Sequence, residues 1–141
     1  MKGYDYVTKS FVRFRDTDPM QMTNHAVVFS YLETARTEYM KALLGFEKVR
    51  DIPYLMAHVE CDFRSPSSYG DVLKTGVRIS EIGSKSFTME YRVEQADSGR
   101  LVAEAETVQV FYDYDNEEPT SAPPDFRERV ASFDADQAGG E

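Results

Sequence analysis

The chain has 141 residues, which predicts one domain spanning residues 1–141, and its 16 lysines and arginines against 25 aspartates and glutamates give a net charge of −9. No run approaches the ~20 apolar residues of a membrane helix, and a single cysteine (Cys61) with two histidines argues against a disulfide, a Cys-based zinc site or a His-rich metal site. The first six residues lack an apolar signal segment, so we expect a cytoplasmic protein.

The N-terminal half predicts one strand and one long helix. Residues 10–15 alternate in polarity and predict the strand, and residues 16–19 have the composition of a turn. From His25 the apolar positions recur every three or four residues as far as Leu44, with Asn24 (or Thr23) as the N-cap and Gly45 as the C-cap. This helix would be roughly 30 Å long. Because it is apolar around much of its circumference, we expect other structure to wrap it.

After Pro53 the polarity alternates with a period of two, which is typical of strands. The pattern predicts strands over residues 59–64, 72–82 (with a bulge or bend at Gly76), 86–94 and 101–112, joined by short turns. Short turns imply antiparallel neighbours. The fold class predicted is therefore α+β, with one curved antiparallel sheet around one helix, and the open sheet edges favour a dimer.

The C-terminal part, from about residue 113 to 141, is an acidic tail. It carries nine acids against Arg127 and Arg129, a charge of −7, and leaves the rest of the chain at −2. We interpret it mainly as a solubilising surface, with a short helix between residues 124 and 133. An acidic tail argues against nucleic acid as a partner, whereas the nearly neutral remainder leaves room for a local basic pocket.

The densest polar segment, residues 15–25, joins the first strand to the helix. Free main-chain N–H groups and the helix dipole stabilise negative charge at a helix start. These groups would stabilise the oxyanion that forms when a nearby carboxylate attacks the carbonyl of a thioester, or when that carboxylate activates a water to attack it. From spacing alone, however, Asp-x-Asp before a helix is more often a turn and a cap.

The run Phe14–Tyr39, FRDTDPMQMTNHAVVFSYLETARTEY, resembles the N-terminal signature of hotdog-fold acyl-CoA thioesterases, the 4-hydroxybenzoyl-CoA thioesterase-like family. Later segments agree with it, namely residues 62–66, 69–71, 83–87, 102–104 and 124–129. The resemblance implies a hotdog fold, hydrolysis of an acyl-CoA to a carboxylic acid and CoA, no metal or other cofactor, and assembly as a homodimer or homotetramer with the pocket at a subunit boundary.

The same resemblance assigns the site residues. Asp18 matches the family's catalytic acid, as nucleophile or general base. The main-chain N–H of His25 would stabilise the oxyanion, and Asn24 and Val27 would line the substrate site. Glu33 is the second choice for the base, because a related thioesterase class uses a helix glutamate.

This chain departs from the family pattern at one place, where Gln21-Met22 replaces Gly-His. The change removes a flexible loop position and makes the expected pocket more apolar. It motivates an alternative function, a non-catalytic protein that binds acyl-CoA or an acyl-carrier protein. A dehydratase is disfavoured, because neither His25 nor His58 lies in a dehydratase-like motif.

Other polar residues receive structural interpretations. We expect Asp16 to make a turn or to pair with Arg15, and Cys61 to be a small buried residue. Four scattered bases could meet CoA phosphates, and their spacing does not select among them: Arg64, Lys74, Lys85 and Arg92.

Overall fold

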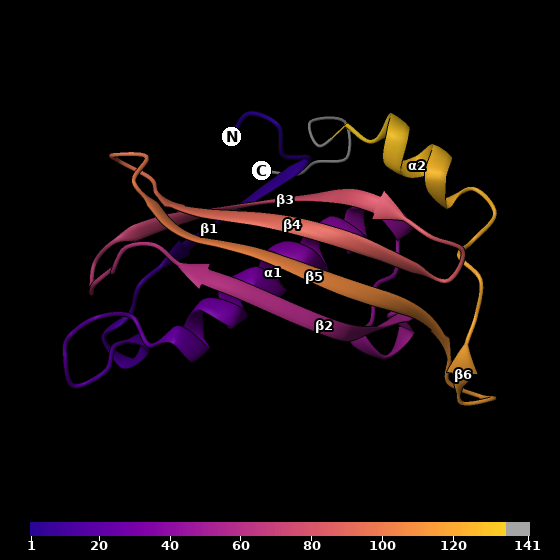
Figure 1. The fold of residues 1–141 in the computed structure, drawn as a ribbon, viewed down its shortest axis with the longest axis horizontal. Helices are drawn as coiled ribbons and strands as arrows, with labels where there is room; N and C mark the ends of the chain where they lie inside the picture. The colour runs from indigo at the N-terminus through magenta and orange to yellow at the C-terminus, as the bar shows by residue number, and fades with distance from the viewer. Residues whose placement is uncertain (135–141) are drawn as a thin grey trace.

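The computed structural model describes residues 1–134. Its elements in chain order are β1 (Tyr6–Phe11), a 3-10 turn (Phe14–Asp16), α1 (His25–Leu44), a second 3-10 turn (Val49–Asp51), β2 (Tyr54–Phe63), β3 (Val72–Ile82), β4 (Ser86–Gln95), β5 (Leu101–Asp113), β6 (Glu118–Pro119) and α2 (Phe126–Ser132). The strands form one curved sheet, and α1 crosses one face of it (Figure 1). The predicted α+β hotdog architecture is therefore confirmed.

The main sheet has the order β1-β3-β4-β5-β2, with every neighbouring pair antiparallel, and the short β6 pairs with the end of β5. β1 and β2 are its two edges. Side chains that face α1 from the central strands are buried, whereas most side chains of β2 are exposed. One edge of the sheet thus leaves apolar side chains uncovered.

The long helix begins and ends as predicted. The side chain of Asn24 caps it by accepting a hydrogen bond from the N–H of Ala26, and Gly45 ends it in the left-handed conformation that glycine adopts without strain. Leu32, Ala35 and Tyr39 are almost fully buried against the sheet. No helix within residues 1–134 is long and apolar enough to cross a membrane.

The first strand lies earlier in the chain than predicted. β1 pairs with β3 from Tyr6, opposite Val77, to Phe11, opposite Val72, where β3 begins. Beyond Phe11 the chain has no strand to pair with, and residues 14–16 form a 3-10 turn instead. The alternating polarity of the sequence continues beyond Phe11, where β1 no longer pairs with β3. The prediction of a strand over residues 10–15 was therefore wrong after Phe11.

Gly76 is not the site of a bulge. The register of β3 with β4 is unbroken at Gly76 and shifts between Ile79 and Glu81. A Cβ atom at Gly76 would instead collide with the side chains of Met1 and Tyr4. This glycine therefore lets the N-terminal residues lie against the strand.

The acidic C-terminal part contributes to the core as well as to the surface. α2 lies within the predicted residues 124–133, and its Phe126 is fully buried against Phe87 and Phe111. Asp136 and Glu141, which belong to the predicted tail, lie outside the described residues.

Candidate active site

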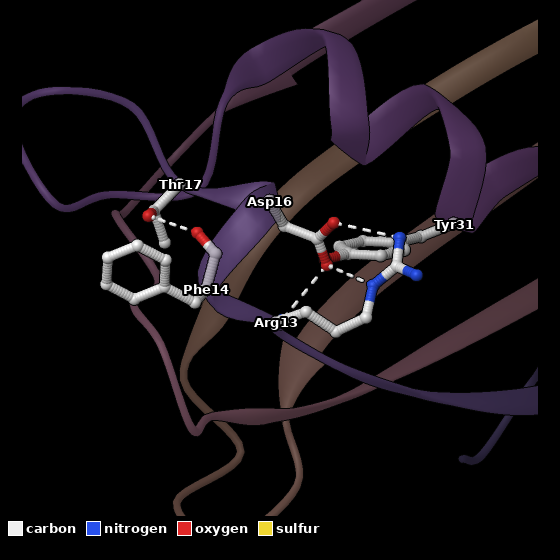
Figure 2. A network of polar contacts seen from close by, with 5 residues as sticks. All are labelled: Arg13, Phe14, Asp16, Thr17 and Tyr31. Carbon is white, nitrogen blue, oxygen red and sulfur yellow. Dashed lines mark hydrogen bonds and ion pairs between the residues drawn. The ribbon is translucent and has the colours of Figure 1, made fainter.

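A buried aspartate fixes the loop between β1 and α1 (Figure 2). Asp16 Oδ1 accepts a hydrogen bond from Arg13 Nη2 at 3.0 Å, and Oδ2 accepts one from the Tyr31 hydroxyl at 3.0 Å and another from the main-chain N–H of Arg13. The carbonyl oxygen of Asp16 also accepts a main-chain hydrogen bond from Asn24. The ion-pair partner is therefore Arg13 rather than the predicted Arg15, and the network ties the loop to the helix start.

The same contacts set the charge of this network. Burial alone would raise the pKa of Asp16, but the hydrogen bonds from Arg13 and Tyr31 outweigh it and lower that pKa. Burial and the neighbouring carboxylate raise the pKa of Tyr31. Asp16 is thus a stable anion whose oxygens are occupied by protein donors, which suits a structural role.

Asp18 lies two residues further along and is only half-buried. Its Oδ1 accepts hydrogen bonds from the main-chain N–H groups of Met20 at 2.9 Å and Met22 at 3.4 Å. The turn that these hydrogen bonds close contains Gln21, the residue in place of the family's glycine. Gln21 has a φ of +64°, a left-handed conformation that is uncommon for residues other than glycine. Oδ2 of Asp18 makes no hydrogen bond to the described residues, so one carboxylate oxygen remains available.

The helix start lies beside this turn. The side chain of Asn24 accepts a hydrogen bond from the N–H of Ala26, and its main-chain carbonyl oxygen accepts one from the N–H of Val27. The main-chain N–H of His25 makes no hydrogen bond within residues 1–134. It remains a donor at the positive end of a 20-residue helix.

Asp18 and His25 line one cavity of about 440 Å³. Its other walls come from the α1 start, the end of β2 and the loop that follows β2, and one residue of β5: Met22, Thr23, Val28, Phe63, Arg64, Ser65, Pro66, Ser67 and Val102. The structure thus brings Asp18, the first residue of α1 and apolar side chains to one cavity.

Two contacts hold the cavity walls in place. The His25 imidazole is exposed and stacks on the Phe63 ring, with centroids 3.8 Å apart. Buried Thr23 and Ser67 exchange hydrogen bonds, including one of 2.7 Å between their hydroxyls. These contacts join the helix start to the loop after β2.

The other predicted residues lie elsewhere. Asn24 caps the helix, and Val27 packs against the core; neither lines the cavity. Glu33 is exposed two turns further along α1, and Cys61 is half-buried at the edge of the core. Among the four predicted bases, Arg64 lines the cavity while also pairing with Asp62 and Glu104.

The sequence interpretation missed Val28, Phe63 and Ser67 as cavity residues. Phe63 belonged to a segment that matched the family pattern, and that match was the available signal. The pairing of Thr23 with Ser67, 44 positions apart, had no signal in the spacing. Within residues 1–134, no group of three or more His, Cys, Asp or Glu side chains could hold a metal ion.

Comparison with known proteins identifies the family. A family model described as "Thioesterase-like superfamily" matches residues 12–130. The chain belongs to this superfamily. The enzyme class expected from the sequence, a thioester hydrolase, is thereby confirmed.

Solved structures of thioesterases resemble this superfamily member closely. A thioesterase of Thermus thermophilus, complexed with coenzyme A and Zn, has a TM-score of 0.86 and 30% identity over 96% of this chain and 98% of that chain. A 1,4-dihydroxy-2-naphthoyl-CoA thioesterase of Synechocystis, at 19% identity and a TM-score of 0.80, covers 91% of this chain and 96% of its own and supports the fold. A curated 1,4-dihydroxy-2-naphthoyl-CoA hydrolase of Synechocystis is 30% identical over 47% of this chain and 48% of its own.

Proposed function

We propose that this thioesterase-like protein hydrolyses an acyl-CoA to a carboxylic acid and CoA at the cavity lined by Asp18 and His25. The observation that carries the proposal is that two residues line one cavity: Asp18, which keeps one carboxylate oxygen without a hydrogen bond to the described residues, and His25, whose main-chain N–H is unused within residues 1–134. The similar Thermus thioesterase is complexed with coenzyme A, which supports the substrate class.

In the proposed reaction, the carbonyl oxygen accepts a hydrogen bond from the N–H of His25, which stabilises the negative charge that develops on it. Asp18 Oδ2 either attacks the carbonyl carbon or takes a proton from an attacking water. The C–S bond then breaks, the CoA thiolate takes up a proton, and water supplies the acid's second oxygen. The main-chain N–H groups of Met20 and Met22 hold Oδ1 of Asp18, and this orients Oδ2.

We further propose that Asn24 contributes to the site by capping α1, and that Val27 contributes by packing against the core behind the helix start. Arg64 is the cation proposed to meet a CoA phosphate, because it is the one among the four predicted bases that lines the cavity. A cytoplasmic location stays a prediction.

We also propose that the protein assembles as a homodimer or homotetramer. The edge strand β2 has no partner on one side within residues 1–134, and its side chains Met56, Val59 and Phe63 are exposed beside exposed Phe29 of α1. Such an edge is a template for another chain. A second copy would cover these apolar groups from solvent and complete the walls of the cavities that they line.

The test is release of free thiol from a panel of short, long and aromatic acyl-CoAs. The parent protein should release thiol from at least one substrate, and Asp18→Asn should lose this activity while keeping the fold, because an asparagine oxygen can still accept the turn's hydrogen bonds. Asp97→Asn, in an exposed turn away from the cavity, is the matched control. Parent-like activity in Asp18→Asn would refute the role of Asp18.

The second candidate is a non-catalytic binder of acyl-CoA or of an acyl-carrier protein. Its support is that Met22 lines the cavity where the family pattern has a histidine, and that Asp18 Oδ1 closes a turn. Tight binding of acyl-CoAs without thiol release from any of them would favour this candidate over hydrolysis.

A further inference from the structure

A second cavity, of about 160 Å³, lies between α1 and β2. Its apolar walls are Phe29, Leu32, Met56 and Val59. A cavity of about 150 Å³ is large enough for benzene, so this one has room for the end of an acyl group. Its charged lining residues are Arg36 and Glu33.

Arg36 is an unusual residue for this position, because its side chain is only 8% exposed. Its Nη1 donates a hydrogen bond to the Tyr91 hydroxyl at 3.2 Å. Its Nη2 lies 4.0 Å from Glu33 Oε2, beyond hydrogen-bond distance, and the Glu33 side chain is 72% exposed. Other guanidinium donors therefore remain unused within residues 1–134.

The polar network behind Arg36 accepts one of its guanidinium donors. The Tyr91 hydroxyl accepts from Arg36 and bonds to Thr107 at 2.7 Å; Thr107 in turn donates to Gln109, whose amide donates to the Phe87 carbonyl oxygen. Burial raises the pKa of Tyr91, so the phenol stays neutral and supplies no counter-charge. The guanidinium is thus held by one hydrogen bond to Tyr91, and Arg36 lines the cavity.

The residues of α1 that line the two cavities follow one another along one side of the helix. His25, Phe29, Leu32 and Arg36 recur every three or four residues and share one side of α1. The Phe63 ring contacts a residue of each cavity, stacking on His25 of the first and meeting Phe29 of the second edge-on. At about 1.5 Å per residue, the α1 residues that line the second cavity run from Phe29, about 6 Å beyond His25 along the helix axis, to Arg36, about 16 Å beyond it.

We propose that the second cavity binds the far end of the acyl group, and that Arg36 binds a carboxylate there. This inference rests on the proposed function, because it assumes that the thioester lies at the helix start. The substrates would be CoA monothioesters of dicarboxylic acids. A carboxylate is favoured over a neutral group for two reasons. It compensates the buried charge of Arg36, and its two oxygens can accept hydrogen bonds from two guanidinium N–H groups.

Glu33 lies beside this site and lowers its affinity for a carboxylate without blocking the cavity. Its carboxylate is near enough to repel a substrate carboxylate, yet its exposure lets it turn toward solvent. Removing its charge should strengthen the binding of a dicarboxylic substrate. Glu33→Gln, at an exposed position, is therefore a variant that tests the proposal without disturbing the core.

The experiment compares suberoyl-CoA and sebacoyl-CoA with the methyl-ended octanoyl-CoA and decanoyl-CoA. In the parent protein, kcat/KM should favour the carboxylate-ended substrate of each pair by roughly tenfold or more. Glu33→Gln should increase this ratio, whereas Arg36→Gln should abolish it and Arg36→Lys should restore part of it. Tyr91→Phe keeps the cation but removes its positioning hydrogen bond, so the ratio should fall only partly.

Binding to Asp18→Asn, measured by calorimetry with the same four thioesters, separates this inference from the proposed function. An Arg36-dependent preference in binding without any thiol release in the parent would support the second cavity and refute hydrolysis. Hydrolysis of both substrates of each pair at equal kcat/KM, unchanged by Glu33→Gln, would overturn the inference and leave hydrolysis intact. Where Arg36→Gln does not fold, the Glu33→Gln result decides.

Discussion

At the scale of single residues, the two aspartates of the Asp-Thr-Asp run have different surroundings. Asp16 is buried with its oxygens bonded to Arg13 and Tyr31. Asp18 is half-buried and lines a cavity, and one of its oxygens makes no hydrogen bond to the residues that the structure describes. The sequence interpretation expected a structural role for Asp16 and a catalytic one for Asp18, and the surroundings of Asp16 agree with the first. It could not predict the partner of Asp16, because Arg13 and Arg15 are both near in sequence.

Replacing Asp16 by Asn should destabilise the protein by about 1–3 kcal/mol, because it weakens buried charge-assisted hydrogen bonds. The pKa of Asp16 is lowered in the folded state, so its stabilisation is present above the ordinary aspartate pKa and is lost as pH falls through the lowered value. Urea unfolding at several pH values should show a flatter acid limb for the variant. Parallel limbs for parent and variant would contradict this role.

Gln21 adopts a left-handed conformation, which costs an L residue roughly 1–2 kcal/mol, whereas glycine adopts it freely. Gln21→Gly should therefore stabilise the protein by about 0.5–1 kcal/mol after the larger entropy of the unfolded glycine chain is included. Thermal unfolding checks this value. A lower melting temperature in the variant would show that the glutamine side chain contributes more than the strain removes.

At the scale of secondary-structure elements, prediction succeeded where local chemistry decides and failed where pairing decides. The bounds of α1 followed from Asn24, Gly45 and the apolar period between them. The start of β1 depended on where β3 begins, and the role of Gly76 depended on side chains from the distant N-terminus. Neither relation is visible in a local pattern.

The sheet carries a row of carboxylates, in which Glu106 of β5 lies between Glu60 of β2 and Glu90 of β4. A hydrogen bond shared with Glu60, together with the nearby negative charges, raises the pKa of Glu106. The repulsion is relieved below the ordinary glutamate pKa and returns as pH rises through the raised value.

Glu106→Gln should therefore raise the melting temperature at neutral pH, because like charges opposite one another destabilise a sheet. The gain should shrink as the pH is lowered and the parent's Glu106 becomes protonated. Scanning calorimetry at neutral and acidic pH measures both effects. A gain that is the same at both pH values would rule out repulsion as its cause.

At the scale of the whole molecule, both cavities lie between α1 and β2, beside the sheet edge that leaves apolar side chains exposed. The sequence predicted the helix and the wrapping sheet, and it placed Asp18 beside the helix start. It could not predict the cavity walls, because these come from segments as far apart as Thr23 and Val102.

Val59→Glu should weaken assembly through β2, since it places a charge among the exposed apolar side chains of that edge. Sedimentation velocity should show a dimer or tetramer for the parent and a shift toward monomer for the variant. A parent that stays monomeric at micromolar concentration would contradict the proposed assembly.

The most direct test of the whole account is kcat for Asp18→Asn at saturating acyl-CoA, measured by thiol release on the best substrate of the panel. Loss of a positioned base should lower kcat by about 10²–10⁴-fold while KM and the melting temperature stay near those of the parent. An unchanged kcat would contradict the account, because the helix-start cavity would then not be the place where the thioester is cleaved.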